Sequence, residues 1–119
     1  MGKQSLIEIY GSFENHIINQ KKDWWDYVSI SWKLSEKFIE NNKDKVNWEY
    51  ISKYQKLSED FIRKHADKVD WYNISEYQSI SEGFIEEFCD MVDWTCFRYR
   101  TDLSIDFMTK YEYLIKEYM

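Results

Sequence analysis

The sequence of 119 residues has no proline and only 3 glycines, so it lacks the residues that usually form the tight turns of an all-β fold. No apolar run reaches the roughly 18 residues that a membrane span requires. The N-terminal residues show no apolar secretory segment, and there are only 2 cysteines. We therefore expect a helical, cytoplasmic protein with free thiols and no membrane contact.

Positive charge is also scarce, because 16 Lys and Arg residues face 22 Asp and Glu residues, for a net charge of −6. Contact with nucleic-acid backbones needs clustered Lys and Arg, so the composition argues against direct nucleic-acid binding. Aromatic residues are abundant at 19%, with 6 Trp and 10 Tyr. The length and apolar content are sufficient for one folded domain with a modest core.

The tryptophans reveal an internal repeat, because Trp25, Trp48, Trp71 and Trp94 are each 23 residues apart. The columns that align on them give the pattern W-x-x-I-S-x-x-Q-x-L-S-E-x-F-I, followed by seven residues that end near Val. A fixed period of this length is typical of helical arrays. We divide the single domain into an N-terminal cap, four repeats and a tail: 1–23, 24–46, 47–69, 70–92, 93–115 and 116–119.

Each repeat has two positions at which a helix can begin. Asp70 and Asp93 directly precede a repeat Trp and are favoured N-caps, and the Ser of the L-S-E step is a second N-cap followed by acids. In the third repeat the pattern predicts helix A over Trp71–Tyr77 and helix B over Glu82–Met91. Both serine columns are interpreted as helix caps. One helix pair cannot bury its own apolar stripe, so we predict a small all-α solenoid with an N-terminal capping helix over residues 5–19.

The tandem W-x-x-I-S-x-x-Q-x-L-S-E-x-F-I pattern resembles short repeats of proteins from large DNA viruses and bacteriophages. The resemblance covers Trp25–Ile115 and is weakest in the fourth repeat, where Arg98, Thr101 and Ile105 replace Ser, Gln and Glu. It implies an α-solenoid in a viral or phage setting, hence in the host cytoplasm, and it implies no chemistry. The small size and acidity also suggest, by analogy, an anti-CRISPR-like inhibitor of host defence.

Motifs for catalysis are missing from the sequence. It has no P-loop, no G-x-G-x-x-G and no H-E-x-x-H pattern, and His16 and His65 do not recur with the repeat. Cys89 and Cys96 lack a second pair of ligands for zinc, and we interpret them as buried free thiols. We therefore predict a protein that is not an enzyme and holds no metal or cofactor.

The third repeat has an unusual charge distribution, with six acids and no Lys or Arg in residues 70–92. Within predicted helix B, three acids stand at i, i+4 and i+5 and therefore cluster on one side of the helix: Glu82, Glu86 and Glu87. One hypothesis is an acidic surface that binds a basic partner, such as a nucleic-acid-binding host protein. The alternative is an acidic surface without function. The acidic contact residues predicted here are Glu76, Glu82, Glu86, Glu87 and Asp90.

Aromatic residues that depart from the repeat are the second group of predicted contacts. Tyr54 and Tyr77 share a column that is serine in the first repeat, and Trp32 stands where later repeats have glutamine. Exposed Tyr and Trp are frequent interface anchors, although packing between repeats is the alternative for all three. A rival hypothesis is a structural, self-assembling module, since the C-terminal end has no polar capping helix and offers a route to a homo-oligomer.

Overall fold

The computed structural model describes residues 22–116, and every regular element in this range is a helix. The elements are α3 (Lys22–Ser31), α4 (Glu36–Asn41), α5 (Trp48–Tyr54), α6 (Glu59–Lys64), α7 (Trp71–Tyr77), α8 (Glu82–Glu87), the 3-10 helix η1 (Trp94–Phe97), α9 (Ile105–Lys110) and α10 (Glu112–Ile115). This confirms the predicted all-α class. The predicted capping helix over residues 5–19 lies outside the described residues.

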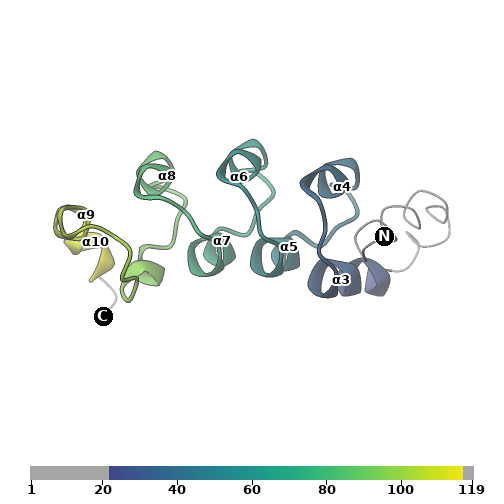
Figure 1. Ribbon diagram of the computed structural model, residues 1–119, viewed down its shortest axis with the longest axis horizontal. Coiled ribbons are helices and arrows are strands. Elements are labelled where there is room, and N and C mark those ends of the chain that lie inside the picture. The colour runs from purple at the N-terminus through teal and green to yellow at the C-terminus, as the bar shows by residue number, and fades with distance from the viewer. Residues whose placement is uncertain (1–21, 117–119) are drawn as a thin grey trace.

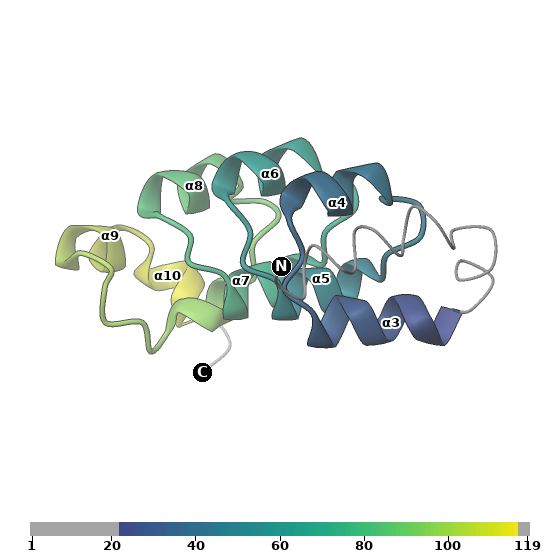
Figure 2. The same cartoon turned by 45° about the vertical axis from the view of Figure 1, so that its right-hand side comes forward.

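The helices form two rows (Figure 1). Helices α3, α5 and α7 lie side by side as row A, and α4, α6 and α8 form row B above them in both views (Figure 2). Within row A, α5 packs against α3 and α7, and η1 continues the row beyond α7. The stack is elongated, with principal extents of 52 × 26 × 21 Å. This is the arrangement of a helical-repeat protein, in which each unit contacts its neighbours.

In the second and third repeats, both helices begin at a capping side chain. Asp70 has an extended backbone, and its side-chain oxygen accepts a hydrogen bond from Asn73 N at 3.0 Å. Asn47 caps α5 in the same way. The B helices and α9 begin at the serine of the L-S-E step: Ser35, Ser58, Ser81 and Ser104. These caps confirm both predicted helix starts, and α7 has the predicted bounds.

Helix B is shorter than predicted, because α8 ends at Glu87 and does not reach Met91. Phe88 leaves the helical region with φ −110° and ψ 36°. Its carbonyl accepts hydrogen bonds from Met91 N at 2.8 Å and Val92 N at 3.1 Å, which closes a tight turn. The turn places Val92 in the core directly before the next repeat. Apolar spacing continues through this turn, so periodicity alone cannot distinguish it from another turn of helix.

The core lies between the two rows. The apolar residues at its centre are fully buried: Val28, Ile39, Ile51, Ile62, Ile74, Ile85 and Phe97. Each repeat tryptophan packs against this core, and the Trp71 ring stacks on Phe84 of its own repeat with centroids 6.2 Å apart. The repeated apolar columns therefore build the fold, as the sequence predicts.

A buried serine column connects each repeat to the next. The prediction that Ser29, Ser52 and Ser75 cap helices is wrong, since all three lie buried inside helices of row A. Ser75 Oγ donates to Trp71 O at 2.7 Å and accepts from Asp93 N of the next repeat at 2.9 Å. The predicted bounds of helix A already place Ser75 inside a helix, where a serine can bond to the carbonyl four residues before it, whereas its contact with Asp93 depends on the packing of the next repeat.

The repeat glutamine makes a second buried junction. Gln78 Nε2 donates to Ser52 O at 2.8 Å and to Gln55 O at 2.6 Å, and its Oε1 accepts from Leu57 N at 3.0 Å. Gln55 makes the same three contacts with the first repeat. One buried amide thus satisfies three main-chain groups where the preceding repeat bends between its helices. This requirement explains the glutamine in the second and third repeats.

Candidate functional site

The predicted acidic residue Glu82 lies at a junction between repeats. Its carboxylate accepts hydrogen bonds from Ser104 N at 2.5 Å and Ser104 Oγ at 3.0 Å, both in the fourth repeat. Glu59 binds Ser81 in the same manner, at 2.6 and 3.2 Å. Glu36 accepts the same two hydrogen bonds from Ser58 of the second repeat. Glu82 therefore belongs to a contact that recurs at every junction between described repeats.

Glu86 and Glu87 also bind neighbouring repeats. Glu87 forms a bidentate pair with Arg63 of the preceding repeat, with both N–O distances at 2.8 Å. Glu86 accepts hydrogen bonds from Tyr111 Oη at 2.5 Å and Lys110 Nζ at 3.1 Å in the following repeat. These hydrogen bonds hold the pKa of each carboxyl group below its ordinary value. Both groups are therefore charged at neutral pH, and cations of the same molecule accompany them.

These ion pairs follow a common spacing along row B. Glu40 pairs with Lys64, Arg63 with Glu87, and Glu86 with Lys110, and the partners are 24 residues apart each time. Of the six acids of the third repeat, Glu86 and Glu87 thus find a cation in a repeat on either side. A charge count taken repeat by repeat therefore overstates the acidity of this face.

Two predicted acidic residues form neither a Glu–Ser contact nor an ion pair with a neighbouring repeat. Asp90 is exposed in the turn after α8 and makes a long contact of 3.8 Å with the Cys89 thiol. Glu76 is exposed on α7 and accepts a hydrogen bond from the Cys96 thiol. Burial and then this hydrogen bond raise the pKa of Cys96 to about 12, so the thiol is protonated at neutral pH. The prediction of two buried thiols is wrong, since Cys89 is exposed and Cys96 is half-buried.

The predicted aromatic residues have different surroundings. Tyr54 and Tyr77 are 48% and 50% exposed on α5 and α7. Lys53 Nζ lies between their rings, 5.2 and 5.3 Å from the two centroids. Trp32 instead packs half-buried against the core, and its carbonyl accepts a hydrogen bond from Gln55 at 2.6 Å. The two tyrosines, but not Trp32, stand out from the surface.

Tyr72 is an exposed residue of the same row that the sequence reasoning missed. It is 54% exposed and lines a hollow of about 270 Å³ with Lys53 between α5 and α7. It also lines a hollow of about 410 Å³ with Tyr99 between α7 and η1. The nearby Glu76 carboxylate raises the pKa of the Tyr72 hydroxyl, so this group is neutral and able to donate a hydrogen bond. The available signal was its column, where other repeats have Asp, Glu or Thr.

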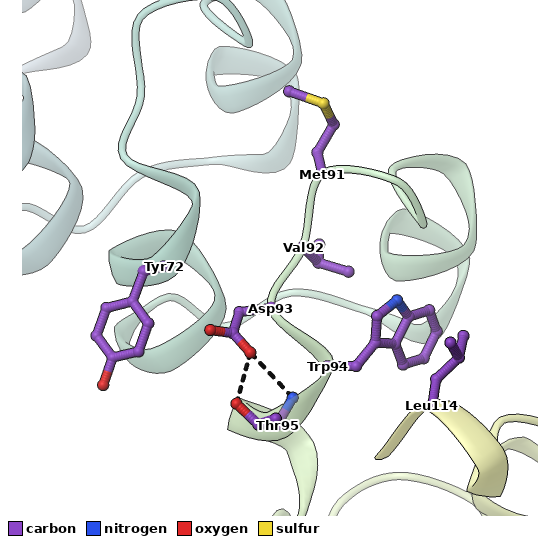
Figure 3. Close-up of a pocket in the computed structure, with 7 residues that line it drawn as sticks. All are labelled: Tyr72, Met91, Val92, Asp93, Trp94, Thr95 and Leu114. Atoms are coloured by element: carbon purple, nitrogen blue, oxygen red, sulfur yellow. Dashed lines mark hydrogen bonds between the residues drawn. The ribbon is translucent and has the colours of Figure 1, made fainter. Parts of the chain in front are cut away.

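Tyr72 also contributes to a third hollow of about 660 Å³, shown in Figure 3. Met91, Trp94 and Leu114 supply apolar walls, while Asp93 is turned toward Thr95 and caps η1. In the preceding repeat the columns of Tyr72 and Met91 hold a glutamate and a lysine. Two charged residues of the second repeat are therefore replaced by Tyr72 and Met91 in the lining of this hollow.

These hollows connect four exposed side chains into one region, which we name the tyrosine surface: Tyr54, Tyr72, Tyr77 and Tyr99. Lys53 contacts the first and third, and shared hollows join Tyr72 to Lys53 and to Tyr99. Large exposed aromatic groups beside concave regions are a common feature of protein interfaces. The tyrosine surface is therefore the candidate binding site.

His65 lies away from this surface. It is buried between the rings of Trp48 and Phe61, and its Nε2 is 2.8 Å from Glu40 Oε2. It lines none of the hollows described above. Within residues 22–116, no group of three or more His, Cys, Asp or Glu side chains is placed to hold a metal. In the same range no helix has the length and apolar character needed to cross a bilayer.

The fold and its junctions define the class of protein: a helical-repeat protein whose units are joined by recurring Gln, Ser and Glu contacts. No family model, no curated protein and no solved structure matches the chain. Function is therefore inferred from the geometry of the chain itself.

Proposed function

We propose that this protein is a non-enzymatic, protein-binding module that contacts its partner through the tyrosine surface. The observation that supports the proposal is the gathering of half-exposed tyrosines on row A, next to three hollows that share Tyr72. Tyrosine offers a large, rigid contact area and a polar hydroxyl, and the hollows have room for partner side chains.

The partner in this proposal is a basic protein. Glu76 gives the tyrosine surface an acidic group, since it lies in the same hollow as Tyr72, which Arg98 and Arg100 also line. Asp90 is the other acid of the third repeat that is available to a partner. Three of the predicted acids already bind neighbouring repeats, so we assign them to the stability of the fold: Glu82, Glu86 and Glu87.

The finer form of the proposal concerns the setting. A viral or phage protein acting in the host cytoplasm, with a nucleic-acid-binding defence protein as its target, agrees with the repeat resemblance, the small size and the net charge of −6. An anti-CRISPR-like inhibitor is one such protein. This setting is an analogy and adds no residue to the site.

The experiment is affinity capture with the full chain, followed by mass spectrometry of the proteins retained from the cells that express it. We expect the double variant Tyr72→Ala/Tyr99→Ala to lose the specific partner, with affinity reduced about tenfold or more. Tyr113→Ala is the matched control, because Tyr113 is 70% exposed on α10 and lies outside the tyrosine surface. Circular dichroism checks that each variant is folded.

A second pair of variants tests the charge of the partner. Glu76→Lys and Asp90→Lys should weaken capture of a basic partner without breaking a described Glu–Ser or ion-pair junction. Reversal of Glu82, Glu86 and Glu87 is a poorer test, since it also disrupts contacts between repeats. Equal capture by the wild type and the tyrosine double variant would contradict the proposed surface.

A further inference from the structure

The C-terminal end of the stack presents a second surface, which is independent of the tyrosine surface. At each described junction a glutamate of one repeat accepts the N–H and O–H of a serine in the next, as Glu82 does with Ser104. In the fourth repeat Ile105 occupies this glutamate column and is 84% exposed. The last described repeat therefore has an apolar side chain where its predecessors have a carboxylate.

Ile105 borders an apolar hollow of about 240 Å³ on this end, together with Leu103, Met108 and Ile115. In the third repeat the columns of Leu103 and Met108 hold Ile80 and Ile85, which are 1% and 0% exposed because the fourth repeat covers them. The hollow is thus the counterpart of an interior junction. Exposed apolar surface beside charged residues is a common feature of interaction sites.

Two charged residues of opposite sign flank the same hollow. Glu112 and Lys116 line it, and their side chains are 54% and 61% exposed and paired along α10. A face with an apolar centre and both charges at its edge is complementary to itself under a twofold rotation. A second copy can place its Lys116 opposite Glu112 and its Glu112 opposite Lys116.

The glutamate column also decides which kind of assembly fits. If a further repeat packed on this end as the interior repeats pack on one another, its serine N–H and O–H would face Ile105. The Ile105 side chain cannot accept a hydrogen bond. Head-to-tail stacking in that arrangement would therefore lack the Glu–Ser contact, which lies at the exposed edge of each described junction. A twofold pairing needs no such contact, because apolar side chains then meet apolar side chains.

We propose that two copies of this chain associate end to end about a twofold axis through this face. Ile105 and Met108 form the centre of the interface, and Glu112 of each copy faces Lys116 of the other. Such an interface is isologous, because each copy contributes the same residues to it, and a twofold interface closes on two copies.

The test is the molecular mass of the full chain in solution, measured by sedimentation equilibrium from micromolar to millimolar concentration. We expect a monomer–dimer equilibrium for the wild type. Ile105→Glu restores the residue of the other repeats and brings two carboxylates together across the axis. It should weaken the dimer about tenfold or more. Tyr99→Glu is the control, since Tyr99 is 82% exposed on the tyrosine surface and should leave the dimer unchanged.

A charge exchange gives an independent measurement. Glu112→Lys and Lys116→Glu should each weaken the dimer, and the chain that carries both substitutions should recover it, because opposite charges again meet across the axis. Thermal melting of each variant checks the fold. A wild type that stays monomeric, a dimer unaffected by Ile105→Glu, or growth beyond two copies would each overturn the proposal.

Discussion

The two rows of helices use their exposed side chains differently. Row B carries charged groups that bind the next or the preceding repeat, such as Glu82 to Ser104 and Arg63 to Glu87. Row A carries tyrosines that remain about half exposed, with Tyr72 shared by three hollows. In this stack, exposed charge on row B connects repeats, whereas the exposed tyrosines of row A belong to the proposed partner surface. The following variants test that division, from the largest expected effect on stability to the smallest.

The largest effect is expected between the rows. Gln78→Ala removes a buried amide and leaves two carbonyls and one N–H without their partners, so the free energy of unfolding should fall by about 2–4 kcal/mol. Chemical denaturation monitored by circular dichroism measures the change. The neighbouring substitution Tyr77→Ala is the control. Equal losses from the two variants would mean that the buried junction is not what joins the repeats.

Within row B, two acids of one repeat should differ. Glu82→Ala removes the acceptor for Ser104 N and Oγ and should cost about 1–2 kcal/mol of stability. Asp90→Ala removes the same charge from a site without an inter-repeat hydrogen bond and should change stability by less than about 0.5 kcal/mol. Denaturation curves for both variants give the comparison, and similar losses would remove the distinction between them.

Acidification should weaken row B. Hydrogen bonds from Lys64, Tyr111 and Arg63 hold the pKa values of Glu40, Glu86 and Glu87, respectively, below the ordinary 4.5. A carboxyl group whose pKa is lower in the folded state stabilises the fold above its unfolded pKa. This contribution is lost as the pH falls through the folded pKa.

The melting temperature should therefore decline from about pH 5 downward. The double variant Glu86→Gln/Glu87→Gln should melt lower at neutral pH and show a shallower decline, since two of the titrating groups are gone. Calorimetry across this pH range measures both properties. An unchanged slope in the double variant would contradict the assignment of these two carboxylates as stabilising contacts.

The smallest effect on stability is expected in row A. Tyr54→Ala and Tyr77→Ala should each change the free energy of unfolding by less than about 0.5 kcal/mol, because their rings are about half exposed and cover little core. Thermal melting checks this. A large loss would show that these rings stabilise the stack. It would contradict their assignment to a surface that contributes little to stability.

Much of the fold could be predicted from the sequence because the repeat supplies several aligned examples of each position. The bounds of α7 and the caps at Asp70 and Ser81 follow from local rules about which side chains begin a helix. The early end of α8 at Glu87 and the role of Ser75 do not, since both depend on where the next repeat packs.

The candidate site was less predictable for the same reason. The acids of the third repeat gave a clear signal in sequence, but their partners lie 24 residues away, as Arg63 does from Glu87. Comparing charges at that spacing would have identified the pairing. Tyr72 could have been found as a departure from its column, yet the hollows around it arise only when neighbouring repeats come together.

The junctions also bear on how such a gene can change. Gln78 and Glu82 bind main-chain groups and serines that every complete repeat carries, so a duplicated repeat would meet its usual contacts on both sides. Unequal recombination between similar coding segments can therefore lengthen or shorten the array in whole units that keep these glutamine and glutamate contacts, whereas ion pairs such as Arg63–Glu87 change with the repeat that is copied. Ile105 sets a boundary to this process, because a unit inserted after it would lack its carboxylate. A unit placed directly after the fourth repeat would thus make one contact fewer than a unit inserted between the second and third repeats.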